Sequence, residues 1–134
     1  MANIENLTKW VKALRSGEFK QGTGTLRTVK PHGEPAYCCL GVVCELMRRE
    51  EPERFSWDEG GGSKCYFVEQ GGEMERDFLS NAAVKWLGVD DRDPLFVMPS
   101  GHEQEHASDL NDNRDLSFYG IAKRIAATFN IELD

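Results

Sequence analysis

Residues 37–46 read Tyr-Cys-Cys-Leu-Gly-Val-Val-Cys-Glu-Leu and hold three of the four cysteines in the chain. An extended run, Ala36-Tyr37-Cys38, leads into a mostly apolar segment from Leu40 to Arg49. Apolar residues around most of a helix are typical of a helix that is buried in a core. We therefore predict a buried helix here, with Arg48 and Arg49 in its last turn, where the helix dipole favours positive charge.

The first helix of the chain is predicted well before this segment. Ile4, Leu7, Val11 and Leu14 recur at helical spacing and would form one apolar face. Asn3 can cap the start of this helix, and Gly17 follows its end.

Two further helices share a second start pattern, in which a serine cap follows a leucine that can pack against an apolar residue inside the helix. Ser80 is the cap of one of these helices, which Gly88 ends. Ser117 is the cap of the last helix, whose apolar face runs to Phe129.

Short β-forming segments and turns rich in Gly and Pro lie between the helices. Extended segments are predicted at 19–29, 36–38, 64–68 and 95–98. Residues 50–63 are charged and Gly-rich, and we predict a mobile loop there. Together these elements predict an α+β fold, with about four helices packed around a small antiparallel sheet in a single domain over residues 1–134.

The size and charge of the chain limit its classes of function. With 134 residues and a mass of 15.1 kDa, it is long enough to bury a core without disulfide or metal staples. The net charge is −7, but residues 1–50 carry eight Lys or Arg against five Asp or Glu, whereas the rest carries eight against eighteen. An acidic chain argues against direct DNA binding, which depends on neutralising phosphates. The mildly basic first part leaves room for an anionic small molecule.

The sequence also gives expectations for the cellular location. No apolar run approaches the roughly 20 residues that a membrane span needs, so no association with a membrane is predicted. The N-terminus lacks the charged-then-apolar pattern of a signal peptide. We therefore expect a cytoplasmic protein whose thiols stay reduced, and we expect no cofactor.

The clustered cysteines allow two interpretations. A thiol at a helix N-terminus has a lowered pKa, and the Cys-x-Gly-x-Val pattern after an extended tyrosine is loosely like the nucleophile helix of papain-like hydrolases. Cys38 or Cys39 would then need a histidine base, for which His102 and His106 are the downstream candidates. Cysteine is also among the most buried residue types and behaves as a small apolar side chain. We prefer this structural role.

A second enzyme hypothesis comes from residues 102–106, which match the His-Glu-x-x-His pattern of zinc peptidases. On a helix, His102 and His106 would bind zinc and Glu103 would act as the base. Because Pro99-Ser100-Gly101 is a poor start for a helix, a polar segment facing solvent is the preferred interpretation. Hydrolysis, either by cysteine or by zinc, is kept as the alternative function.

Four other residues are the candidate ligand contacts. Arg27, at the end of a Gly-Thr-Gly-Thr arm, is the best-placed cation for a carboxylate or a phosphate. Tyr37 lies in a nearby extended segment, whereas Asn111 and Asp112 lie in a predicted turn. Asn and Asp have ordinary structural roles in turns, but their side chains can also line the mouth of a cleft. The sequence thus predicts a cleft lined by these four residues.

Several segments together resemble one group of proteins. They are Trp-Val-Lys-Ala-Leu-Arg-Ser-Gly at 10–17 followed by Gly-Thr-Leu-Arg at 24–27, Tyr-Cys-Cys-Leu-Gly-Val at 37–42, Leu-Asn-Asp at 110–112 and Ser-Phe-Tyr-Gly-Ile-Ala at 117–122. In this order they are similar to small, largely uncharacterised accessory proteins encoded by tailed bacteriophages and prophages. The resemblance covers both ends of the chain, and the Tyr-Cys-Cys-Leu-Gly segment is its most specific part.

The resemblance implies an accessory role during infection, directed at the host cell or its defences and not at building the virion. The expected mode of action is stoichiometric, non-enzymatic binding in the cytoplasm of the host bacterium. The expected partner is either a small nucleotide-like signal held in the cleft or a host protein that this inhibitor would block. Self-association of the chain is left open.

Overall fold

The computed structural model describes residues 2–29, 33–59, 63–99, 101, 103–112 and 116–133. Within these ranges the chain forms five helices and eight short strands, and the strands belong to three small sheets. The predicted α+β class is therefore confirmed.

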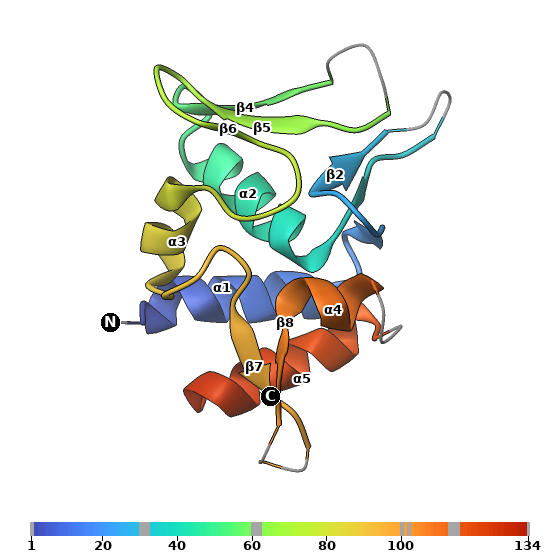
Figure 1. Cartoon of the computed structure of the whole chain (residues 1–134), viewed down its shortest axis with the longest axis vertical. Helices are drawn as coiled ribbons and strands as arrows, with labels where there is room; N and C mark the ends of the chain where they lie inside the picture. The colour runs from blue at the N-terminus through green and yellow to red at the C-terminus, as the bar shows by residue number, and fades with distance from the viewer. Residues whose placement is uncertain are drawn as a thin grey trace.

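Helix α2 (Cys39–Glu50) is the buried helix that the sequence predicts, and eight of its twelve residues are buried. Figure 1 shows α2 between helix α1 (Ile4–Arg15), which lies below it, and the strands at the top of the molecule. It also contacts helices α3 (Asn81–Leu87) and α4 (Ala107–Asp112). Because neighbours cover α2 on several sides, apolar residues are favoured around most of its first two turns.

The other long helices begin where the sequence predicts. Asn3 caps α1 by accepting a hydrogen bond from the Asn6 N–H at 3.1 Å. Ser80 caps α3, and Ser117 caps α5 (Phe118–Phe129), through the same kind of bond. Helix α5 packs chiefly against α1. Within the described ranges, no helix combines the length and the apolar composition needed to cross a membrane.

The first of the three sheets is mixed, with the strand order β1-β3-β2. Its strands are very short: β1 (Lys20–Gln21), β2 (Arg27–Thr28) and β3 (Ala36–Tyr37). Strand β3 pairs with β1 in parallel and with β2 in an antiparallel arrangement. The antiparallel register places Arg27 opposite Tyr37, so two of the predicted ligand contacts are neighbours.

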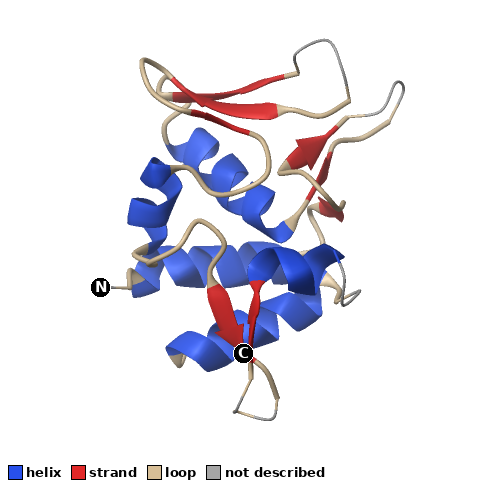
Figure 2. Ribbon diagram, viewed as in Figure 1, coloured by secondary structure: helices blue, strands red, loops and turns tan. Residues whose placement is uncertain are grey.

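The other two sheets are antiparallel and lie at opposite ends of the molecule, as Figure 2 shows. The sheet at the top contains β4 (Phe55–Asp58), β5 (Tyr66–Glu69) and β6 (Met74–Glu75). The sheet at the bottom contains β7 (Leu95–Val97) and β8 (Gln104–His106), beside helix α5. The helices between these sheets supply most of the core.

The prediction of a mobile loop at 50–63 is wrong for its central part, which is strand β4. Phe55 is 1% exposed and stacks on Phe67 of β5, with ring centroids 5.2 Å apart. Trp57 packs against the same ring at 5.1 Å. Burial of aromatic side chains therefore outweighs the charged composition of the segment. Residues 60–62 of the predicted loop lie outside the described residues.

Glu45 is a carboxylate within the buried helix α2, and only 7% of its side chain is exposed. It accepts hydrogen bonds from Arg48 at 2.7 and 2.8 Å, from Arg49 at 3.0 Å and from Trp57 Nε1 at 3.0 Å. Burial by itself raises the pKa of a carboxyl group, but these donors outweigh burial and lower the pKa of Glu45 to about 2. The carboxylate thus joins the end of α2 to strand β4.

This cluster predicts that part of the stability is sensitive to acid. The ordinary pKa is 4.5 and the folded value about 2, so the contribution of Glu45 is complete above pH 4.5 and is lost as the pH falls toward 2. We expect Glu45→Gln to lower the free energy of unfolding by roughly 3 kcal/mol at pH 7 and by less than ~1 kcal/mol at pH 2. Urea unfolding at both pH values measures these losses. The exposed Glu51→Gln is the control and should change little at either pH, whereas a Glu45→Gln loss that is equally large at pH 2 would contradict the prediction.

Candidate functional site

A cavity of about 320 Å³ lies beside the N-terminal end of α2. Segments far apart in the sequence line it: Gly24 and Thr25, Cys38, Lys64, residues 76–78 after β6, and Ser108 and Asp112 on α4. Hydrogen bonds join these walls: the Leu26 N–H donates to the Arg76 carbonyl at 2.8 Å, and the Gly24 N–H donates to the Asp112 side chain, at Oδ1, at 3.1 Å. The cavity is therefore a product of tertiary packing.

The Thr25 hydroxyl is the most informative group of this cavity. Thr25 is only 4% exposed, and its Oγ1 has no hydrogen-bond partner among the residues that the structure describes. A buried hydroxyl without a partner costs roughly 1–3 kcal/mol, and native proteins leave few such groups unpaired. Thr25 is also one of the residues that line the cavity.

Helix α4 supplies a wall of hydrogen-bond acceptors. Asp112 Oδ1 accepts from the Gly24 N–H at 3.1 Å and from Asn111 Nδ2 at 2.8 Å, while its Oδ2 has no hydrogen bond to any described residue. Ser108 donates its hydroxyl proton to the Asp93 carboxylate, and its N–H donates to the same carboxylate at 2.9 Å. Since that proton is committed to Asp93, the Ser108 oxygen offers only lone pairs to the cavity.

Asn111, one of the predicted ligand contacts, is engaged inside the protein and is 2% exposed. Its Oδ1 accepts from Gln21 Nε2 at 2.9 Å and from the Cys39 N–H at 3.2 Å. Its Nδ2 donates to the Gly22 carbonyl at 2.7 Å and to Asp112. These four bonds use the two donors and two lone pairs of the amide, so Asn111 positions Asp112 and the start of α2.

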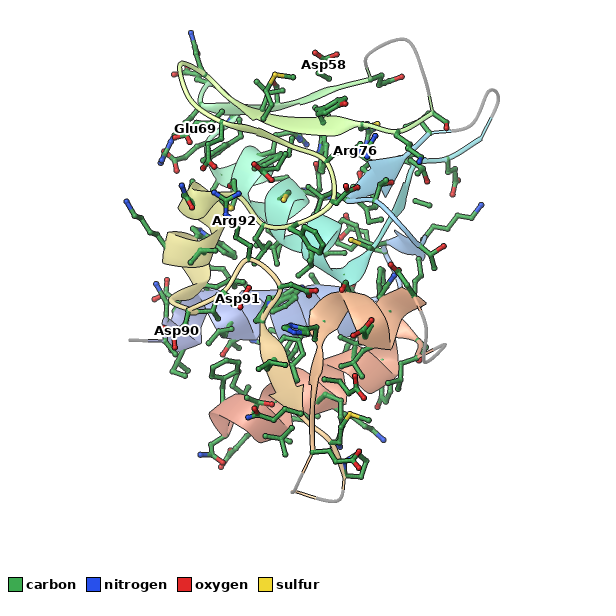
Figure 3. All side chains as sticks on the ribbon, viewed as in Figure 1. Asp58, Glu69, Arg76, Asp90, Asp91 and Arg92 are labelled. Atoms are coloured by element: carbon green, nitrogen blue, oxygen red, sulfur yellow. The ribbon has the colours of Figure 1, made fainter. Side chains whose placement is uncertain are left out.

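The opposite wall of the cavity carries positive charge and an aromatic ring. Lys64 is exposed and forms no ion pair within the described ranges, and Arg76 pairs with the adjacent Asp77 at 3.3 Å. Phe78 is 43% exposed, which is unusual for a phenylalanine. Figure 3 shows Arg76 beyond the end of β6 and close to β2. This wall can attract an anion and offers a flat apolar surface.

Arg27 and Tyr37 lie on the neighbouring β2–β3 pair and do not line this cavity. The Arg27 guanidinium lies 5.8 Å from the ring centroid of Tyr37 and 5.4 Å from that of Trp57. It donates to Tyr37 Oη at 3.4 Å and to Cys65 Sγ at 3.3 Å. The structure thus groups the four predicted residues as two pairs, Arg27 with Tyr37 and Asn111 with Asp112, and ligand binding by the first pair stays a prediction.

Of the nine residues that line the cavity, the sequence predicted only Asp112 as a ligand contact and named Cys38 only as a candidate nucleophile. The seven that it missed are Gly24, Thr25, Lys64, Arg76, Asp77, Phe78 and Ser108. Each is an ordinary residue of a turn, strand or helix end, so no local pattern distinguishes it. The one available signal was Phe78, an aromatic residue that directly follows the charged pair Arg76-Asp77.

The cysteine hydrolase hypothesis finds no support in the geometry. Cys38 and Cys39 are 5% and 0% exposed, and burial raises the pKa of the Cys38 thiol to about 12 although the Gly41 and Leu40 N–H groups act in the opposite direction. Both thiols therefore stay protonated at neutral pH, as expected for structural cysteines. The imidazole of His106 lies against Asp93, with Nδ1 2.6 Å from its carbonyl oxygen, and His102 lies outside the described residues.

The zinc hypothesis requires a correction, because the helix that it needs is absent. Residues 104–106 form strand β8, in which His106 lies opposite Leu95. A strand rises about 3.3 Å per residue, so residues four apart along a strand share a face but lie roughly 13 Å apart, whereas a helix brings them within about 6 Å of each other. Residues 104–106 therefore do not form the helical arrangement that the motif requires, and His102 lies outside the described residues. Among the described residues, no group of three metal-binding side chains is arranged to hold a metal ion.

Together these features define an α+β domain with a central buried helix and a small polar cavity at the start of that helix. The chain belongs to the family described as Domain of unknown function (DUF8296), whose profile matches residues 2–129. No curated protein and no solved structure is significantly similar to the chain.

Proposed function

We propose that this protein binds a small nucleotide-like ligand stoichiometrically in the cavity between α4 and the segments next to β5 and β6. The observation that carries this proposal is Thr25, a residue that lines the cavity and whose buried hydroxyl lacks a partner among the described residues. A bound polar ligand gives that hydroxyl a hydrogen bond and removes the cost of leaving it unpaired.

The chemistry of the walls supports a nucleotide. Lys64 and Arg76 can hold a phosphate, Phe78 can stack on a base, and Asp112 and Ser108 can accept hydrogen bonds from its edge. Stacking of a base on an aromatic side chain is worth about 1–3 kcal/mol. The volume of 320 Å³ lies near the lower end of the range of roughly 300–1,000 Å³ for small-molecule sites, which favours a mononucleotide over a dinucleotide.

The same walls favour binding over catalysis. The only thiol that lines the cavity within the described ranges is Cys38, which is protonated at neutral pH. The Ser108 hydroxyl is bonded to the Asp93 carboxylate, which is a weak base, and not to an imidazole. A nucleophile with a base and an orienting group is therefore missing from the described part of the cavity.

The biological setting of the proposal is that of a phage-encoded accessory protein in the host cytoplasm. By binding one nucleotide signal per chain, such a protein would lower the free concentration of the signal and counter a host defence without catalysis. The sequence resemblance to phage and prophage accessory proteins supports this setting.

The test is a thermal shift series with mononucleotides, cyclic nucleotides and ADP-ribose derivatives, on the purified chain and on Thr25→Val. At a ligand concentration 100 times Kd, binding stabilises the folded state by about 2.7 kcal/mol, which corresponds to a shift of several degrees. Thr25→Val keeps the shape but removes the hydroxyl, so the free variant should be at least as stable as the wild type while its ligand-induced shift is reduced.

The exposed Thr23→Val in the same turn is the matched control and should retain the full shift. If no nucleotide raises the melting temperature of the wild type, the proposal fails. Co-purification of a stoichiometric host protein from infected cells would then favour the version in which the chain blocks a host protein.

A further inference from the structure

The cavity has two chemically different walls, and we infer that it selects a guanine mononucleotide, with the base edge at Asp112 and the phosphate at Lys64 and Arg76. This inference rests on the proposed function and names its ligand class. It follows from the direction of the hydrogen bonds that each wall is able to make.

The described residues of α4 that line the cavity, Ser108 and Asp112, offer it only hydrogen-bond acceptors. An ionised carboxylate has no donor, and the one oxygen of Asp112 without a hydrogen bond to a described residue is Oδ2. The Ser108 hydroxyl donates its hydrogen bond to Asp93 and likewise presents only lone pairs to the cavity. The part of a ligand that lies against this wall must therefore carry adjacent N–H donors.

Among the common bases, guanine has this arrangement. Its N1–H and its exocyclic amino group lie side by side and point the same way, so the two lone pairs of one carboxylate oxygen, here Oδ2, can accept from both. Adenine presents an acceptor, N1, next to its amino group, and that lone pair would face the lone pairs of Asp112. Hydrogen bonds to a charged group are worth about 1.5–3 kcal/mol, so discrimination of roughly tenfold or more is expected.

The orientation of Asp112 is fixed before any ligand binds. The Gly24 N–H and Asn111 Nδ2 hold its Oδ1 from two sides, and Asn111 is anchored by three further bonds to Gln21, Gly22 and Cys39. A preorganised acceptor costs little to align with the base, and this favours selectivity.

The opposite wall suits the remainder of the nucleotide. Lys64 and Arg76 supply positive charge near an exposed aromatic face, that of Phe78. Arg76 is partly neutralised by Asp77, so Lys64 is the stronger attraction for a phosphate. The two walls together match a ligand with a donor edge at one end and an anion at the other.

The experiment is isothermal titration of GMP, AMP and XMP into the wild type and Asp112→Asn. The wild type should bind GMP at least about tenfold more tightly than AMP. In Asp112→Asn the amide oxygen can still accept from Gly24, while the new NH₂ group faces the base. This variant should lose about tenfold or more for GMP and gain affinity for XMP, whose O2 accepts where guanine donates.

Three controls make the result specific. Asp90→Asn changes an exposed carboxylate at the end of α3, away from Arg76 in Figure 3, and should leave GMP binding unchanged. Lys64→Gln should weaken GMP several-fold but leave guanosine unaffected, since guanosine has no phosphate. Lys85→Gln, an exposed lysine on α3, should affect neither.

The outcomes separate the inference from the proposed function. If AMP binds as tightly as GMP, or if Asp112→Asn weakens all three nucleotides equally, the guanine assignment is overturned while nucleotide binding stands. If none of the three binds but another nucleotide does, the assignment is likewise wrong. If no nucleotide of any kind binds, the proposed function itself fails.

Discussion

Replacing Gly41 with alanine is expected to lower the melting temperature by roughly 10 °C, which corresponds to about 3 kcal/mol for a chain of this size. Gly41 lies in the first turn of α2, where a Cβ would lie 2.7 Å from the carbonyl carbon of Leu26 and still closer to its oxygen. These are backbone atoms that cannot rotate away. The Leu26 N–H is bonded to the Arg76 carbonyl at 2.8 Å, and its carbonyl accepts from the Cys38 N–H at 3.2 Å.

The control for Gly41→Ala is Gly120→Ala in helix α5. A Cβ at Gly120 would lie 2.5 Å from Leu116 Cδ2, the end of a flexible side chain that can move. Alanine also stabilises a helix by up to about 1 kcal/mol relative to glycine, so this variant should stay within ~1 kcal/mol of the wild type. Thermal unfolding followed by circular dichroism compares the two. If Gly41→Ala and Gly120→Ala have equal melting temperatures, a Cβ at residue 41 does not clash with the Leu26 backbone, and the prediction is wrong.

Replacing Asn111 with alanine is expected to cost about 3–4 kcal/mol, because it leaves several buried polar groups without partners. The Cys39 N–H and the Gly22 carbonyl lose their bonds of 3.2 and 2.7 Å, and the Gln21 side chain loses one of its acceptors. The first sheet, the start of α2 and α4 all meet at this side chain. Urea unfolding measures the loss of stability.

Two further variants test the role of the Asn111 amide. Asn111→Asp keeps an acceptor for Cys39 but cannot donate to Gly22, and it places a second carboxylate beside Asp112. It should therefore also be clearly destabilised at pH 7. Asn81→Ala removes an exposed side chain that accepts one bond from Arg92 at 2.9 Å, and should cost less than ~1 kcal/mol. If Asn111→Ala lowers the free energy of unfolding by no more than Asn81→Ala does, the hydrogen bonds of Asn111 do not stabilise the fold as proposed.

The candidate site could be predicted only in part. The sequence predicted Asp112 as a ligand contact because Asn and Asp side chains between two helices can line the mouth of a cleft. Asp112 does line the cavity. Thr25, Lys64 and Ser108 come from three distant segments. The cavity depends on Leu26, which hydrogen-bonds both to Arg76 after β6 and to Cys38 before α2. Arg27 was the most prominent cation in the sequence, but aromatic rings of β3 and β4 enclose its guanidinium.

The sequence by itself determined those features that depend on neighbouring residues or on apolar composition. Interactions within a few residues place the helix caps Asn3, Ser80 and Ser117. Apolar composition predicts that α2 and its thiols are buried, and they are buried in the fold. Tertiary structure alone decided that residues 55–58 form a strand and that residues 104–106 are not helical. It also decided that the Thr25 hydroxyl is buried without a partner among the described residues. These outcomes depend on partners distant in sequence, whose approach no local pattern encodes.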